Sequence, residues 1–221
     1  MQDLATLSPV ERWTRALKIL SRVLVNPEAT EQVLEFSSLV NAGTMGQRLH
    51  VFIDDPRGRR LYEEHRAIDS HTVDLAALAA LPEATLGHAY AHFLTSRGLT
   101  PEVFDTPPEE IHDPRVQYVV QRIRQTHDLW HVVTGCNTDP AGEIALQAFT
   151  YAQLRAPSTL ILALAGTLKG AREKRSLPRE VLAAYRAGRH ANKLATFPWE
   201  DHWATPLADV RRMLGLSRAA A

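Results

Sequence analysis

Cysteine is almost absent from this sequence, which holds one in 221 residues, Cys136. An internal disulfide needs two cysteines, so the sequence excludes a disulfide framework and leaves the fold to its apolar core. Proteins without disulfides are typical of reducing compartments. We therefore expect a cytoplasmic protein, with peripheral contact to the inner membrane face as a further option.

Net charge and long apolar runs are lacking as well. The 25 basic and 25 acidic side chains balance, so no overall field attracts nucleic acid, and we expect no nucleic-acid partner. The longest nearly continuous apolar run, at 160–166, is far shorter than the roughly 20 residues that cross a bilayer. The opening "MQDLATLSP" has neither a basic flank nor an apolar stretch, which argues against a signal or transit peptide.

Helix starts are the most frequent signal that is present. A residue that can cap a helix precedes proline at Ser8-Pro9, Asn26-Pro27, Asp55-Pro56, Thr100-Pro101, Asp113-Pro114, Asp139-Pro140 and Thr205-Pro206. Such a pair places a side-chain acceptor before the first turn and a fixed φ inside it. The first pair has Glu11 three residues after Ser8, a capping box. It is followed by an apolar repeat at spacings of three and four: Val10, Trp13, Leu17, Leu20 and Leu24.

These signals predict helices from residue 9 onward and near 27–41, 57–66, 83–97, 114–135, 140–155, 158–173, 178–195 and 206–214. Only "LHVFI" at 49–53 resembles a strand, and 42–56 and 105–114 are the expected long loops. With 45% hydrophobic residues, the chain can bury a sizeable core. We predict an all-α fold, a multi-helix bundle that forms a single domain over residues 1–221.

Two histidine pairs with a spacing of four differ in their surroundings. On the 83–97 helix, His88 and His92 fall opposite the arc that holds Tyr90 and Phe93, so we expect both on the solvated surface.

On the 114–135 helix the pair lies by the apolar side. The apolar arc consists of Val116, Val119, Val120, Ile123, Trp130 and Thr134, and the far side carries Tyr118, Gln121, Arg122 and Gln125. His127 falls inside the arc, His131 at its edge, and Asp128 on the same flank. Buried imidazoles and carboxylates must pair with each other or bind a metal, because an unpartnered buried charge is costly. A hydrogen-bonded His/Asp cluster is the plainer alternative.

The following segment favours the metal. Gly135 ends the helix and Asp139-Pro140 starts the next one, so the two form an antiparallel hairpin. At about 1.5 Å per residue, Glu143 comes level with His131. We predict a divalent metal held by His127, Asp128, His131 and Glu143. The same four are the catalytic candidates.

The same hairpin indicates which metal is bound and which residues contact the substrate. Zinc is the first choice for such ligands, and iron, manganese and cobalt are compatible with them. Along the 140–155 helix, Gln147, Thr150 and Tyr151 continue the polar strip that begins at Glu143, and they are the candidate substrate-binding residues.

The motif His127-Asp128-x-x-His131, followed after eleven residues by Glu143, resembles the metal motif of the coenzyme Q (ubiquinone) biosynthesis protein 4 family. Residues 72–104 resemble a family segment with an LP-x-x-T-LG-x-x-Y core, and residues 184–216 resemble its C-terminal pattern, including Tyr185, Trp199, Glu200 and Arg211. The chain departs from the family at Gln147, where a lysine is expected.

The resemblance implies an all-helical protein of ubiquinone biosynthesis that binds a prenylated quinone precursor, or another isoprenoid lipid, at the membrane face. The implied activity is that of a metal-dependent carbon–carbon lyase, which oxidatively removes the C1 carboxyl group of a polyprenylated hydroxybenzoate ring and hydroxylates that carbon. Association with other ubiquinone-pathway enzymes is implied too. We also expect a homo-oligomer.

Other functions fit parts of the sequence. The protein could be a non-catalytic, lipid-binding scaffold for ubiquinone-pathway enzymes in which the metal is structural. An HD-type metal phosphohydrolase would need further ligands, for which His112 and Asp139 are poorly placed. A zincin peptidase fits less, because Asp128 replaces the glutamate of HExxH. Cys136 and the cluster of Trp199, Glu200, His202 and Trp203 are assigned no chemistry.

Overall fold

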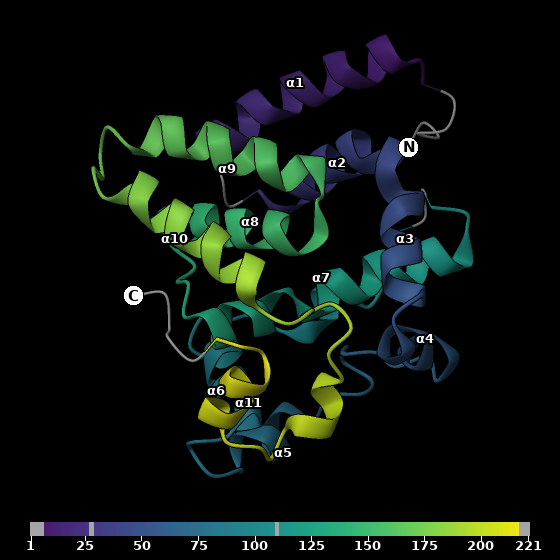
Figure 1. Ribbon diagram of the computed structural model, residues 1–221, viewed down its shortest axis with the longest axis vertical. Coiled ribbons are helices and arrows are strands. Elements are labelled where there is room, and N and C mark those ends of the chain that lie inside the picture. Colours follow the sequence, from purple (N-terminus) through teal and green to yellow (C-terminus); the bar gives the residue numbers. More distant parts are fainter. Residues whose placement is uncertain (1–6, 27–28, 109–110, 217–221) are drawn as a thin grey trace. The chain divides into compact units, whose positions relative to one another are not determined.

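The computed structural model describes residues 7–26, 29–108 and 111–216, and helices dominate it (Figure 1). The α-helices are α1 (Pro9–Val25), α2 (Thr30–Asn41), α3 (Met45–Ile53), α4 (Pro56–Glu63), α5 (Leu75–Ala79), α6 (Leu86–Thr95), α7 (Pro114–Thr134), α8 (Pro140–Leu154), α9 (Pro157–Gly170), α10 (Leu177–His190) and α11 (Leu207–Met213). Short 3-10 helices are η2 (Ala42–Thr44), η3 (Pro101–Phe104) and η4 (Trp199–His202). No β-strand occurs in these described residues. The predicted all-α class is confirmed.

The chain forms two compact units, each built from two stretches of sequence. The first unit consists of Met1–Arg48 and Cys136–Arg189, and the second of Leu49–Gly135 and His190–Ala221. The single domain over 1–221 stays a prediction.

None of the described helices combines the length and the apolar composition that a bilayer span requires.

Local capping explains where several helices begin. Ser8 accepts a hydrogen bond from the Glu11 backbone while Glu11 bonds back to the Ser8 backbone, the predicted capping box. Asp55, Asp113 and Asp139 cap α4, α7 and α8, each with a side-chain oxygen that accepts from a backbone N–H of the first turn. Each carboxylate satisfies backbone N–H groups that the first turn leaves without partners.

The other predicted starts differ. Thr100-Pro101 begins only the short η3, and Pro206 itself occupies the cap position of α11. The start expected at Pro27 lies outside the described residues.

The prediction for residues 42–56 was wrong. This stretch is not a loop with a strand-like centre, because α3 occupies Met45–Ile53. Leu49 and Phe52 are buried while Val51 is 55% exposed. Burial at a spacing of three suits a helix, whereas a strand would have turned Leu49 and Val51 to the same side.

Alpha-helix α5 was not expected, because its five residues are too few to show a helical period. Its N-cap is Asp74, whose side chain accepts a hydrogen bond from the Ala77 backbone.

The core of the first unit lies where α1, α2 and α9 meet. Its buried side chains are Ala16, Ile19 and Val23 of α1, Phe36 and Leu39 of α2, and Leu162 of α9. Asn41 at the end of α2 bonds to Ser158 at the start of α9 through both its amide nitrogen and its amide oxygen, at 2.8 and 3.1 Å. The predicted apolar stripe of α1 is therefore only partly right. Val10, Trp13 and Leu17 belong to it by spacing but are exposed.

Glycine brings α10 against α8 in the same unit. A Cβ added at Gly188 would lie 2.7 Å from the Phe149 carbonyl oxygen and 2.9 Å from the Ala152 Cβ. The two helices can approach this closely only because position 188 has no side chain.

In the second unit α7 is buried on nearly all sides, including the side predicted to be polar. Arg122 is 1% exposed and pairs with Glu200, Nη1 to Oε1 at 2.5 Å and Nη2 to Oε2 at 2.9 Å. The side chain of buried Gln125 accepts a hydrogen bond from the Ile68 backbone at 3.2 Å, and the Tyr118 hydroxyl donates to the Leu61 carbonyl at 2.7 Å. The far side of this helix is therefore not a solvated surface. Tyr118, Arg122 and Gln125 find partners elsewhere in the unit.

Candidate metal centre

The last two turns of α7 carry the histidine pair. The ring centroids of His127 and His131 are 4.9 Å apart and the ring planes are inclined by 67°. His131 is 2% exposed, whereas the side chain of His127 keeps 35% of its surface accessible. The pair therefore joins a fixed imidazole to one that solvent or a ligand can still reach.

His131 is held by groups on other helices of the second unit. Its ring stacks on Phe93 of α6 at 5.6 Å. Arg211 of α11 donates through Nε to the Val133 carbonyl and through Nη2 to the Val132 carbonyl, both at 2.9 Å. Gly135, with φ +77°, ends the helix and donates its N–H to the His131 carbonyl at 2.9 Å. These contacts fix the end of α7 and with it the position of His131.

The supporting role of Arg211 was not recognised from the sequence. Arg211 lies 78 residues from Val133, and no local pattern links the two.

Asp128 is placed beside His127. One carboxylate oxygen lies 3.6 Å from Nδ1 of His127, and the carboxylate is largely screened from solvent. Burial raises the pKa of Tyr90, and the negative charge of Asp128 raises it further, so Asp128 also lies near this phenol. When a carboxylate faces one nitrogen of an imidazole, the other nitrogen is left for a cation.

Glu143 stands in the first turn of α8. The turn before it is tight, because the Asp139 side chain accepts from the Gly142 backbone at 2.8 Å. A Cβ at Gly142 would lie 2.1 Å from the Asn137 carbonyl oxygen. A glycine is therefore required one residue before Glu143.

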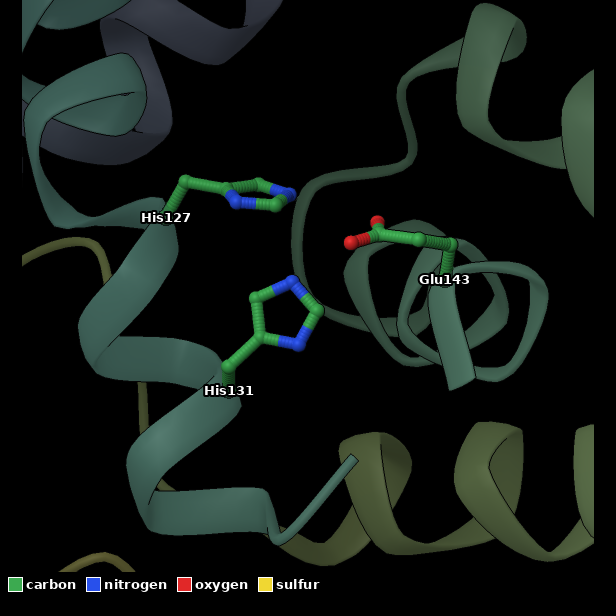
Figure 2. A group of neighbouring side chains, drawn as sticks. All are labelled: His127, His131 and Glu143. Carbon is green, nitrogen blue, oxygen red and sulfur yellow. The ribbon is translucent and has the colours of Figure 1, made fainter. Parts of the chain in front are cut away.

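His127, His131 and Glu143 form a group that could hold a metal ion, as Figure 2 shows. Each offers one ligand atom, and these atoms all lie within 4.8 Å of one another. Ligand atoms around a tetrahedral zinc are about 3.4 Å apart, given bonds of about 2.1 Å. Two imidazoles and one carboxylate are ligand types that zinc accepts. The donor set fits a divalent metal.

The fourth predicted ligand, Asp128, is not in this group. Its place as a direct ligand stays a prediction.

The candidate substrate-binding residues lie further along α8. Thr150 is buried, and Gln147 and Tyr151 are half-buried. The side-chain oxygen of Gln147 is buried without a hydrogen-bond partner, so it can accept one from a bound molecule. Tyr151 instead stacks on Tyr185 of α10 at 6.2 Å.

The second histidine pair differs in part from the prediction. His92 is exposed, as expected for a surface residue, but His88 is half-buried. Nδ1 of His88 lies 3.0 Å from the Ala79 carbonyl oxygen and 3.1 Å from that of Leu81. This imidazole therefore closes the end of α5, a role that its helical phase did not reveal.

Comparison with known proteins places these features in a family. The family model described as coenzyme Q (ubiquinone) biosynthesis protein Coq4 matches residues 2–220. A relative from Laccaria bicolor, named ubiquinone biosynthesis protein COQ4, mitochondrial, is 31% identical over 195 residues, which are 87% of this chain and 65% of the relative. A relative of the same name from Talaromyces marneffei is 32% identical over 212 residues, 95% of this chain and 74% of the relative. The chain spans about two thirds to three quarters of these proteins.

A crystal structure from Nostoc punctiforme, of a protein described as a candidate for ubiquinone biosynthesis, has the same fold. The TM-score is 0.74 at 28% identity, over 93% of this chain and 98% of that one. The family model spans nearly the whole sequence, and the resemblance seen in the motifs is thereby confirmed. This chain belongs to the coenzyme Q (ubiquinone) biosynthesis protein Coq4 family.

Proposed function

We propose that this chain is a metal-dependent enzyme of ubiquinone biosynthesis that removes the C1 carboxyl group of a polyprenylated hydroxybenzoate by oxidation and hydroxylates the same carbon. Family membership supports the pathway. The observation that carries the chemistry is the group of His127, His131 and Glu143, whose ligand atoms lie within 4.8 Å of one another.

In this proposal His127, His131 and Glu143 bind the divalent ion, zinc in the first instance, and Asp128 either completes the ligand set or orients His127. A bound divalent ion supplies a Lewis acid for a carboxylate or phenolate of the ring. The buried oxygen of Gln147, one turn after Glu143 on α8, accepts a hydrogen bond from a ring hydroxyl and orients the ring.

The reaction must balance in electrons. The bond from C1 to the carboxyl carbon breaks and carbon dioxide leaves, while a new bond joins C1 to oxygen. This replacement is a two-electron oxidation of the ring. Because zinc does not change valence, an oxidant of the dioxygen class has to be supplied to the site.

The proposal also covers the substrate, the partners and the location of the protein. A polyprenyl chain keeps the ring at a membrane, so the enzyme works at the membrane face and can exchange intermediates with other ubiquinone-pathway enzymes. The two curated relatives are named mitochondrial, and the cytoplasmic location stays a prediction for this chain.

Metal analysis tests the site directly. Purified wild type is compared with His131→Ala and Glu143→Ala, and His92→Ala serves as the matched control because His92 is an exposed histidine outside the group. We expect close to one equivalent of divalent metal in wild type and control, and a large loss in the other two. Equal metal content in all four proteins would end the case for the site.

Turnover tests the reaction. The protein is given a prenylated hydroxybenzoate labelled in its carboxyl carbon under air, and labelled carbon dioxide and the hydroxylated ring are measured. Metal-loaded wild type that releases neither contradicts the catalytic proposal.

A scaffold with a structural metal is the second candidate, favoured by the nearly complete burial of His131. The partial exposure of His127 and Asp128 argues for an open coordination position instead. Cobalt-substituted protein whose spectrum does not respond to added ring carboxylates, together with no turnover, would support the scaffold.

A further inference from the structure

Among the described residues of the first unit, six of the seven large apolar side chains that remain exposed lie on α1 and α9, and the seventh is Leu182 of α10. Val10, Trp13 and Leu17 of α1 are 76%, 47% and 61% exposed, and Leu164 and Leu168 of α9 are 57% and 78% exposed. We call these five the α1/α9 surface. Single exposed leucines are ordinary, but several on two helices that touch mark a contact surface.

The two helices lie side by side. Ile161 of α9 packs against the core cluster that contains Ala16 and Ile19 of α1, and Nζ of Lys169 donates to the Leu24 carbonyl near the end of α1. Figure 1 shows α1 and α9 as neighbours. The spacing of Val10, Trp13 and Leu17 puts them on one side of α1, away from the buried Ile19 and Val23.

The charges near this surface are mostly positive. Over Pro9–Val25 the charged residues are Glu11, Arg12, Arg15, Lys18 and Arg22, and over Pro157–Gly170 the only one is Lys169. The first unit holds 13 basic and 9 acidic residues, and the second holds 12 and 16. The balanced total therefore hides a basic first unit.

We propose that the α1/α9 surface docks on an anionic phospholipid bilayer. Trp and Leu on one side of a helix with Lys and Arg beside them are typical of helices that lie in the plane of a membrane. The apolar side chains enter the acyl boundary while Lys18 and Arg22, both exposed, reach the phosphates with their long stems. The idea rests on the proposed function, which places the substrate in a membrane, and it names the face that meets it.

A second copy of the chain is the competing occupant of this surface. In a two-fold dimer the same face meets itself, so the basic residues of α1 would approach those of the other copy. A phospholipid surface of negative charge complements them instead. The charge pattern therefore favours lipid.

Vesicle sedimentation tests the docking. Wild type is mixed with vesicles of phosphatidylcholine alone or of phosphatidylcholine with phosphatidylglycerol, and the bound fraction is measured. We expect tighter binding to the mixed vesicles. Leu17→Ser combined with Leu168→Ser should weaken it at least tenfold, the change expected when about half of one leucine side chain is no longer buried.

Val51→Ser is the matched control, because Val51 is 55% exposed but lies on α3 in the second unit. It should leave vesicle binding unchanged. Lys18→Glu should weaken binding to the mixed vesicles and not to the neutral ones. Trp13 is the exposed tryptophan of the surface, so its emission should shift to the blue when vesicles are added to wild type.

Three results would overturn the proposal: no binding of wild type to either vesicle, an equal loss in Val51→Ser, or a dimer that Leu17→Ser with Leu168→Ser dissociates while vesicle binding persists. Metal content is measured in the same variants, and we expect it unchanged. If wild type fails to bind vesicles but retains its metal, the docking proposal is wrong and the proposed metal site still stands. If the His131 and Glu143 variants lose the metal but still bind vesicles, the α1/α9 surface is independent of the metal site.

Discussion

Replacing Glu200 by glutamine removes the charge that faces a buried guanidinium. The Arg122 side chain is 0% exposed and the Glu200 side chain 16% exposed, and the two form a bidentate pair. Breaking such a pair by removing one partner costs about 3 to 5 kcal/mol, because the remaining charge stays buried without compensation. For a chain of this size that loss lowers the unfolding temperature by roughly 6 to 20 °C.

Urea unfolding followed by circular dichroism measures the effect. Asp201→Asn is the control next in sequence, because Asp201 pairs with Arg66 while its own side chain is 45% exposed, and an exposed pair contributes about 1 kcal/mol or less. The double variant Arg122→Met with Glu200→Gln should recover part of the loss, since the unpaired charge is gone as well. A loss below about 1 kcal/mol in Glu200→Gln would refute the reasoning from burial.

Two further predictions concern the first unit. Gly188→Ala should destabilise the protein by about 1 to 3 kcal/mol in the same unfolding assay, because the new methyl group meets α8 at 2.7 Å. Gly43→Ala, with nothing within 4 Å of the new Cβ, should be nearly neutral, and an equal loss in both would contradict the argument. Hydrogen bonds from Arg155 and Arg189 lower the pKa of Tyr185, so Arg155→Ala should raise it, as read from tyrosine absorbance during a base titration. An unchanged midpoint would show that the guanidinium does not act on this phenol.

The candidate site was predictable where its signals are local. The spacing of His127 and His131 places both on one side of α7, and Gly135 and Asp139 limit the turn that leads to Glu143. Such signals act within a few residues and need no knowledge of the rest of the chain. The sequence leaves the pairing of Asp128 with His127 open beside the metal, because it permits the carboxylate to turn toward a metal or toward its neighbour.

Other parts of the interpretation failed where a distant partner decides the outcome. The sequence placed Arg122 and Gln125 on the side of α7 opposite the apolar arc, and both are buried. Glu200 lies 78 residues from Arg122, and Ile68 lies 57 residues from Gln125. The burial of apolar residues was also predicted wrongly. Trp13 and Leu17 are exposed, although the apolar pattern of their helix predicted that they would be buried.

The sequence alone determined the all-α class, most helix starts, and the positions of the two histidines and the glutamate on their helices. It could do so because capping and helical periodicity depend on neighbours along the chain. Only the tertiary structure decided which polar groups of α7 are buried, that Arg211 fixes the end of that helix, and which apolar side chains of α1 and α9 stay exposed. Burial depends on what packs against a surface, and that partner is supplied by segments far away in the sequence.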